Sequence, residues 1–346
     1  MTHNTPLSPR PSHHPVADSG RVLTAVQLRA HGVTAAETDE RCRPGGPWQR
    51  LLPGVVLLRP GPPTGEERLR AVLLYAAPQR TAGGVPAQPG PGGEAGAGRS
   101  GAMITGLAAL TLHGVAGAPP LPSLDTIDVL VPRQRRLRSA GWARIVRATA
   151  PPEPETVTGV PVAPVARALA DAVAVLTDAA AVHRLLTEAV RGGHCEPAAV
   201  VRELRRARLL SRPHVVDAVE SLVAEGRAIT EDRLYRMVRE YGLPDPVWNV
   251  ELRLPGGPRL GGLDAYWPDH AVAVELDTRG HRQGDDAQAS RAARKRERLE
   301  RLGVTVVHLT PRELRDVPEQ QAVVVRTALM AAGDREPAAY LVVLPR

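Results

Sequence analysis

Hydrophobic and polar positions in the first sixty residues follow a helical spacing and then a strand-like one. Short helices are expected at about 24–30 and 34–42, each next to a residue suited to cap or end it. The apolar, β-branched stretch 48–59 is typical of two strands joined by a tight turn at Pro53-Gly54. A helix, a turn, a helix and a hairpin form the outline of a winged helix-turn-helix, which we place at residues 19–64.

The middle of the chain alternates helical and strand-like stretches. Helices are expected at about 66–76 and 103–113, and strands at 126–131, 143–147 and 157–162. The segment 78–101 is made largely of Gly, Pro, Ala and Gln, so we interpret it as a flexible insertion within an α+β region at 65–162. Residues 163–228 carry Ala, Val and Leu at helical spacing and predict three or four packed helices.

The last third, residues 229–346, has the pattern of one sheet covered by helices. The expected order is a helix, three strands, a helix, a strand and a helix, at about 230–241, 248–254, 263–267, 271–277, 288–302, 304–309 and 311–332. This order predicts an α/β sandwich built on one mixed sheet. The fold class expected for the whole chain is therefore α/β multidomain, with a winged helix-turn-helix, an α+β middle region and a C-terminal sandwich.

Three acidic residues fall on the two strands at the centre of this last domain. If Pro268-Asp269 is a two-residue hairpin turn, Asp264 faces Ala273, and Glu275 is its diagonal neighbour on the same face. Asp277 shares that face by the period of two, while Val272, Val274 and Leu276 pack on the other. A three-residue turn would reverse this parity and separate the carboxylates.

Clustered carboxylates repel each other unless a cation lies between them. Oxygen ligands at this density suit a hard divalent ion, Mg²⁺ or Mn²⁺, which polarises a phosphate and lowers the pKa of bound water. The alternative is structural: Asp277 caps a turn, and Asp264 forms a salt bridge at the sheet edge with one of the many arginines. Both interpretations stay open at the level of sequence.

Composition changes the weight of the basic residues. The 346 residues include 44 Lys and Arg against 37 Asp and Glu, but Phe is absent, Gly and Pro number 32 and 34, and Lys295 is the sole lysine. Such usage is typical of a GC-rich coding sequence, so the net charge of +7 is weak evidence for a nucleic-acid partner. A lysine retained on the apolar stripe of the 288–302 helix indicates either a need for a compact ammonium or chance.

Several classes of protein are excluded by pattern alone. No apolar run approaches the length of a membrane span, and the start MTHNTPLSPRPSHH lacks the apolar core of a signal peptide, so we expect a cytoplasmic protein with no membrane partner. Residues 1–18 are expected to form a disordered tail. Cys42 and Cys195 lie far apart with no ligands at zinc spacing, which predicts two inert thiols.

The stretch GLDAYWPDHAVAVELDTRGH, followed by ARKRERLERLGVTVVHLTPREL, resembles the PD-(D/E)XK superfamily, in the branch similar to very-short-patch-repair endonucleases. The resemblance covers residues 229–316 and implies a restriction-endonuclease-like fold that cleaves DNA with Mg²⁺ or Mn²⁺. It implies that Asp264, Glu275 and the carbonyl of Leu276 bind the metal. Glu231 matches a glutamate on the family's first helix, and His281 matches a histidine that follows the motif.

The sequence departs from the family pattern at two points. Asp277 stands where the usual lysine would be, and Thr278 follows it where the family has glycine. Members are known to supply the lysine from a neighbouring helix, and Lys295 fits that role, stabilising charge on the phosphate. Asp277 or His281 would then orient the attacking water.

Residues 21–59 resemble the winged helix that opens the abortive-infection type IV antitoxin (AbiEi) family, and GLAALTLHGV, TIDVLVPR and GVPVAPVARALADAV resemble segments that follow in it. The resemblance implies a DNA-binding regulator of a toxin gene in phage defence. The stretch 34–42 is acidic, however, with Glu37, Asp39 and Glu40 against Arg41. A winged helix that binds protein is the alternative.

Two hypotheses follow. In the first, the chain is a metal-dependent DNA endonuclease with an N-terminal DNA-targeting or regulatory domain; its expected DNA contacts are Arg43, Arg50, Arg59, Arg291 and Arg294. In the second, it is an antitoxin-like regulator or binding protein whose nuclease fold is inactive and whose partner is a toxin or another protein. Convergence of Asp264, Glu275 and Lys295 would favour the first, and neutralisation of Glu275 by an arginine the second.

Overall fold

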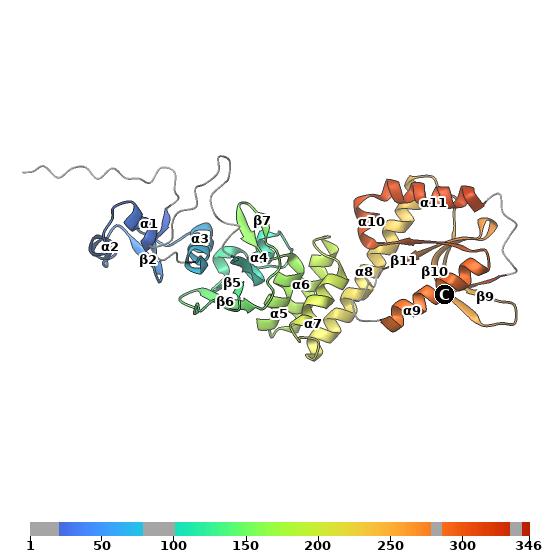
Figure 1. Cartoon of the computed structure of the whole chain (residues 1–346), viewed down its shortest axis with the longest axis horizontal. Helices are drawn as coiled ribbons and strands as arrows, with labels where there is room; N and C mark the ends of the chain where they lie inside the picture. The colour runs from blue at the N-terminus through green and yellow to red at the C-terminus, as the bar shows by residue number, and fades with distance from the viewer. Residues whose placement is uncertain (1–20, 79–100, 278–285, 333–340) are drawn as a thin grey trace, which may run out of the picture. The chain divides into compact units, whose positions relative to one another are not determined.

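The computed structural model describes residues 21–78, 101–277, 286–332 and 341–346, the side chains of 286–289 excepted. Contacts divide the chain into two compact units. The first runs to residue 172 without 115–117, and the second takes in 115–117 and the residues from 173 onward. Figure 1 colours the first from blue to green and the last third of the chain from yellow to red. None of the described helices is long and apolar enough to cross a bilayer.

The first unit opens with two short helices and a three-stranded sheet in the order β1-β3-β2. Its elements are β1 (Val22–Thr24), α1 (Ala25–Ala30), α2 (Ala35–Arg41), β2 (Gln49–Leu52) and β3 (Val55–Leu57). Thr24 begins α1 with a capping box, and Thr34 caps α2 by accepting the N–H of Glu37. The two helices and the hairpin agree with the sequence pattern, and β1 is an additional strand.

The rest of this unit is a five-stranded mixed sheet, β6-β5-β4-β8-β7, with three helices. Its elements are α3 (Gly65–Ala76), β4 (Met103–Thr105), α4 (Gly106–Leu112), β5 (Ile127–Pro132), β6 (Ala143–Ala148), β7 (Glu155–Val157), β8 (Val160–Val162) and α5 (Val165–Val175). The helix expected from residue 103 is wrong over its first turn, because the fully buried β4 lies between β5 and β8. Gly106, at φ +63°, turns the chain into α4.

The second unit begins with helices α6 (Ala179–Arg191), α7 (Pro197–Arg206) and α8 (Pro213–Glu240). The break expected at residues 228–230 is wrong, because α8 is a single helix of 28 residues. Gly226 weakens the helix locally, but a Cβ there would lie 2.3 Å from Cγ of Pro197 at the start of α7. Glycine is therefore what allows α7 and α8 to pack, and the packing keeps α8 continuous across the expected domain boundary.

A second five-stranded mixed sheet, β12-β11-β10-β9-β13, forms the centre of this unit, as the sequence pattern predicts for one mixed sheet. Its strands are β9 (Val247–Arg253), β10 (Arg259–Trp267), β11 (Val272–Leu276), β12 (Thr305–Leu309) and β13 (Val342–Pro345); the helices are α9 (Asp286–Arg301), α10 (Pro311–Asp316) and α11 (Pro318–Ala332). Among the neighbouring strands of this sheet, β11 and β12 run parallel and the other pairs run antiparallel.

The sheet carries a core on each face. Val272, Val274 and Leu276 pack with residues of α8, α10 and α11, whereas Ala273 packs with Leu299 of α9 on the opposite face. Figure 1 shows α9 on one side of these strands and α10 and α11 on the other. The unit is therefore an α/β sandwich with helices on both faces.

The turn between β10 and β11 is longer than the two-residue hairpin expected. Pro268–His270 form a 3₁₀ turn, and Ala271 follows at φ +48°. Ala265 consequently pairs with Val274 and Trp267 with Val272, a register shifted by two residues from the prediction. An even shift preserves which residues share a face.

Candidate active site

The carboxylate of Asp264 lies almost buried near the end of β10, with 8% of the residue exposed. Continuing the β10–β11 register places Asp264 opposite Glu275, closer than the diagonal relation expected. Oδ2 of Asp264 accepts the backbone N–H of Leu276 at 2.7 Å, and Oδ1 accepts Nη2 of Arg227 at 3.1 Å. Both oxygens are therefore fixed by donors from separate elements.

The regular alternation of β10 breaks at Asp264. Leu263 packs in the core on the α9 side, but Ala265, two residues later, packs in the core on the α8 side. On the neighbouring strand, Asn249 has φ +50°, an irregularity between the partners of these two residues. Asp264 sits at this switch and contacts α8, whereas Glu275 contacts α9.

Lys295 of α9 reaches the cluster as the sequence predicts. Its Nζ donates to Oε1 of Glu275 at 2.8 Å and to the carbonyl of Gly262 at 2.6 Å. The side chain is 19% exposed and runs over Gly261, where an added Cβ would lie 2.7 Å from Cε of Lys295. The glycine therefore makes the space through which the lysine reaches Glu275.

Arg227 is the member of the cluster that the sequence analysis missed. Its Nε donates to Oε1 of Glu231 at 2.7 Å, while its Nη2 donates to Asp264, so one guanidinium bridges two carboxylates. Arg227 lies four residues before Glu231 on α8, a spacing that places both on one face of the helix. The structural alternative for Asp264, a salt bridge to an arginine, is thus realised in part.

Burial dominates the electrostatics of Asp264. It raises the pKa of this carboxyl above its ordinary value, and the Leu276 N–H and the Arg227 charge counteract the rise. The charges of Glu231 and Glu275 raise the pKa of Asp264 further by repulsion. Hydrogen bonding to Glu231 raises the pKa of Arg227, so this cation stays charged.

His308 is a second residue that the sequence analysis did not find. It pairs with Glu275 across the parallel strands β11 and β12. Burial lowers the pKa of its imidazole, and the nearby Arg296 and Lys295 charges lower it further. Its Nε2 is buried without a hydrogen-bond partner among the described residues, which leaves a neutral ring nitrogen beside the cluster.

The other expected site residues have mixed outcomes. Asp277 directly follows β11, and its backbone N–H donates to the carbonyl of Leu309 at 2.9 Å. Arg291 and Arg294 are exposed on α9, the helix that carries Lys295. His281 lies outside the described residues, so its role stays a prediction.

Asp264 and Glu275 are the residues of this cluster that could hold a single Mg²⁺ or Mn²⁺. Within the described ranges, no group of three or more His, Cys, Asp or Glu side chains is arranged to hold a metal. Mg²⁺, however, commonly uses one or two carboxylates and completes its shell with water and substrate phosphate. Asp264 and Glu275 supply two such carboxylates next to the Leu276 backbone, and the Arg227 guanidinium shows that a cation fits against Asp264.

Two of the three expected DNA contacts of the N-terminal unit have acidic partners. Arg50 forms an ion pair with Asp39, and Arg59 forms one with Glu67 of α3. Arg43 is exposed. Two of the three arginines therefore neutralise carboxylates of the same unit, which lowers the positive charge available to phosphates.

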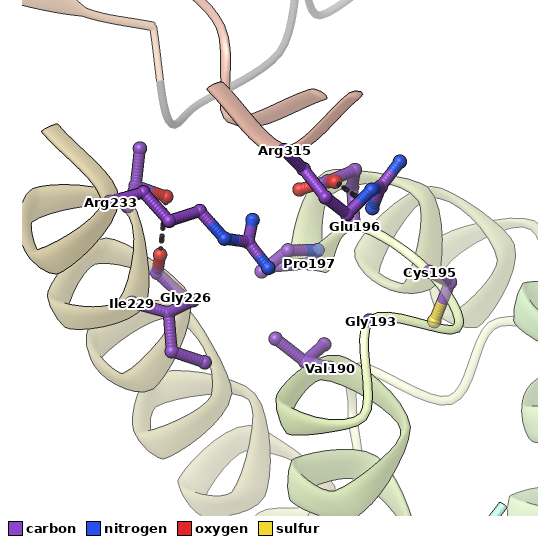
Figure 2. Close-up of a pocket in the computed structure, with 10 residues that line it drawn as sticks. Val190, Gly193, Cys195, Glu196, Pro197, Gly226, Ile229, Arg233 and Arg315 are labelled. Carbon is purple, nitrogen blue, oxygen red and sulfur yellow. Dashed lines mark hydrogen bonds and ion pairs between the residues drawn. The ribbon is translucent and has the colours of Figure 1, made fainter. Parts of the chain in front are cut away.

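A hollow in the C-terminal unit lies between the α6–α7 loop and α8, away from the Asp264 cluster (Figure 2). The space between its lining residues is about 230 Å³ including solvent-open space, and little of this is enclosed, whereas most ligand pockets enclose several hundred Å³. Arg315 at its rim donates to Glu196 at 2.8 Å. Burial raises the pKa of the adjacent Cys195 thiol to about 12 and also raises the pKa of the Cys42 thiol, which disfavours a reactive thiolate at both positions. This hollow is therefore a poor candidate for the substrate site.

Comparison with models of protein families and with curated proteins finds no match to this chain. The resemblances to PD-(D/E)XK nucleases and to AbiEi antitoxins stay expectations. Any functional assignment must accordingly come from the side chains gathered around Asp264 and Glu275.

Proposed function

We propose that the chain is a metal-dependent DNA endonuclease whose active site is the cluster around Asp264 and Glu275. The observation that supports this most is the convergence of a buried carboxylate, a second carboxylate and the sole lysine of the chain. Burying an aspartate beside two other acids is unfavourable for folding. Such an arrangement is typical of functional sites, where burial and neighbouring charges perturb the pKa values of carboxylates that bind a cation.

In this proposal, Asp264 and Glu275 hold one Mg²⁺ or Mn²⁺ together with the Leu276 carbonyl. The bound ion would polarise the scissile phosphate and lower the pKa of its water. Lys295, held by Glu275 and Gly262, is proposed to stabilise the charge that develops on the phosphate. Asp277 and His281 are proposed to orient the attacking water.

The DNA strand is proposed to approach along α9. Arg291 and Arg294 are exposed on this helix and precede Lys295 by four residues and one residue. Arginines on a helix that leads to the cluster would contact phosphates on either side of the scissile bond. In the N-terminal unit, two of the three arginines expected to contact DNA, Arg50 and Arg59, are paired with acids, which makes α9 the stronger candidate for backbone contacts.

A second candidate function is a regulator or binding protein with an inactive nuclease fold. It is favoured by the cations that already neutralise both carboxylates, Arg227 at Asp264 and Lys295 at Glu275. It is also favoured by the acidic partners of Arg50 and Arg59, which suit a protein partner, such as a toxin, better than DNA. In this case the cluster would be a structural ion-pair network.

Cleavage of supercoiled plasmid by the purified full chain separates the two functions. We expect nicking in Mg²⁺ that EDTA abolishes, and that Asp264→Asn and Glu275→Gln reduce to background. Asp232→Asn is the matched control, because Asp232 is an exposed acid on α8 whose ion pair with Arg236 lies outside the cluster. Equal nicking by the wild type and both cluster variants would identify a contaminant and refute the endonuclease.

A further inference from the structure

The guanidinium of Arg227 occupies the cation position of the Asp264 cluster. It donates to Asp264 at 3.1 Å and to Glu231 at 2.7 Å, and its side chain is 36% exposed. Asp264 itself is almost buried and would otherwise carry a poorly solvated charge. The arginine therefore supplies a positive charge between two neighbouring carboxylates.

Each carboxylate oxygen of Asp264 already accepts one hydrogen bond, Oδ2 from the Leu276 N–H and Oδ1 from Arg227. A divalent ion that binds on the Oδ1 side would therefore share this oxygen with the guanidinium. The guanidinium and the ion would lie within a few ångström of each other, and like charges at that separation repel strongly when partly buried. Both cannot occupy the site unchanged.

We infer that Arg227 is an internal counter-cation. It organises Asp264 and Glu231 before metal binding, and the incoming divalent ion displaces it. This positioning role rests on the proposed metal centre. It predicts that Arg227 weakens metal binding while it stabilises the metal-free protein. Arg227 can move away without unfolding α8, because its contacts in the cluster are side-chain contacts at a partly exposed position.

Calorimetric titration of the full chain with Mn²⁺ tests this inference. Arg227→Gln should bind Mn²⁺ about tenfold more tightly than the wild type, equivalent to about 1.4 kcal/mol. The same variant should melt at a lower temperature in EDTA and gain more from Mn²⁺, because the repelling carboxylates lose their counter-charge. Arg236→Gln is the control, since Arg236 is an exposed α8 arginine in an ion pair with Asp232, four residues before it; its affinity should equal the wild type's.

The outcomes distinguish the inference from the proposed function. If Asp264→Asn abolishes Mn²⁺ binding but Arg227→Gln binds no more tightly than the wild type, the counter-cation role is wrong and the metal centre stands. If Mn²⁺ binding does not depend on Asp264 in the wild type or in any variant, including Arg227→Gln, both the inference and the proposed metal centre fail. Arg227→Lys serves where the glutamine variant does not fold: one ammonium cannot bridge both acids as the guanidinium does, so tighter binding by about threefold is expected, and an unchanged affinity overturns the inference.

Discussion

Replacing Gly261 by alanine tests whether the backbone beneath Lys295 holds this side chain against Glu275. Gly261 has φ +128°, and an added Cβ would lie 2.7 Å from Cε and 3.0 Å from Cδ of Lys295. The backbone conformation alone is strained for an L residue by about 1–3 kcal/mol. The lysine must also leave its hydrogen bonds to Glu275 and Gly262, which are worth about another 1 kcal/mol.

We expect the free energy of unfolding of the second unit to fall by about 2–4 kcal/mol in Gly261→Ala, and its melting temperature by roughly 5–15 °C. Urea denaturation followed by tryptophan fluorescence is a suitable assay, because Trp267 is buried in this unit and donates to the Pro244 carbonyl at 2.7 Å. Gly256→Ala is the matched control: Gly256 has φ +63° with no atom within 4 Å of an added Cβ. It should lose only about 1 kcal/mol.

A double-mutant cycle isolates the contact with the lysine. Lys295→Ala in the Gly261→Ala background removes the atoms that the new Cβ would meet, so the combined loss should be smaller than the sum by about 1 kcal/mol. Additive losses would refute the reasoning, because they would show that Gly261 does not position Lys295. Nicking activity should fall in Gly261→Ala and stay unchanged in Gly256→Ala.

Three further predictions concern the protonation of Asp264, the burial of Cys195 and the exposed arginines of α9. Burial raises the pKa of Asp264, so the folded chain binds a proton there more readily than the unfolded chain. This group therefore makes the free energy of unfolding fall as the pH rises from about 4. In urea denaturation of Asp264→Asn at a series of pH values, this part of the pH dependence should be missing. Cys195, with a pKa of about 12, should resist iodoacetamide at pH 8 in the folded protein and react once urea unfolds it, as peptide mass spectrometry can show; rapid labelling in the native state would contradict the burial. The double variant Arg291→Gln with Arg294→Gln should reduce the magnitude of the slope of log affinity against log salt for duplex DNA by about 2. Arg50→Gln should leave this slope unchanged, because Asp39 already neutralises Arg50. Equal slopes for the wild type and all variants would show that α9 does not contact the DNA.

The pairing of Asp264 with Glu275 on neighbouring strands could be predicted from the side-chain period of two, but the break in the alternation of β10, which directs Asp264 to α8 and leaves Glu275 against α9, could not. A turn of two residues and the observed longer turn both preserve that parity, so the error in register moved Glu275 from a diagonal to an opposite position. The longer turn itself could not be predicted. Its last residue, Ala271, has φ +48° without being glycine or asparagine, so the sequence carries no signal for it.

The residues that the sequence did not reveal depend on tertiary contacts. Arg227 was missed because the sequence pattern was divided between two helices at residues 228–230, and only the packing of Gly226 against Pro197 shows why one helix continues. His308 was missed because a histidine in an apolar strand gives no local signal. Its proximity to Glu275 arises from parallel pairing between strands separated by α9.

The N-terminal arginines illustrate a similar limit. Arg50 and Arg59 are separated in sequence from the acids that neutralise them, Asp39 and Glu67, so charge counts along the chain did not reveal the pairs. Lys295 is the opposite case. Composition identified it as the sole lysine, and helical spacing predicted that it lies on the face of the helix that packs on the sheet. In the structure its Nζ lies 2.8 Å from Oε1 of Glu275.

The position of bound Mn²⁺, located by anomalous scattering in crystals of the full chain, tests the central claim most directly. The proposal predicts one Mn²⁺ in contact with oxygens of Asp264 and Glu275, with the Arg227 guanidinium moved away from Asp264. An empty cluster at saturating Mn²⁺, with Arg227 still bonded to Asp264 and Glu231, would contradict the metal-dependent endonuclease.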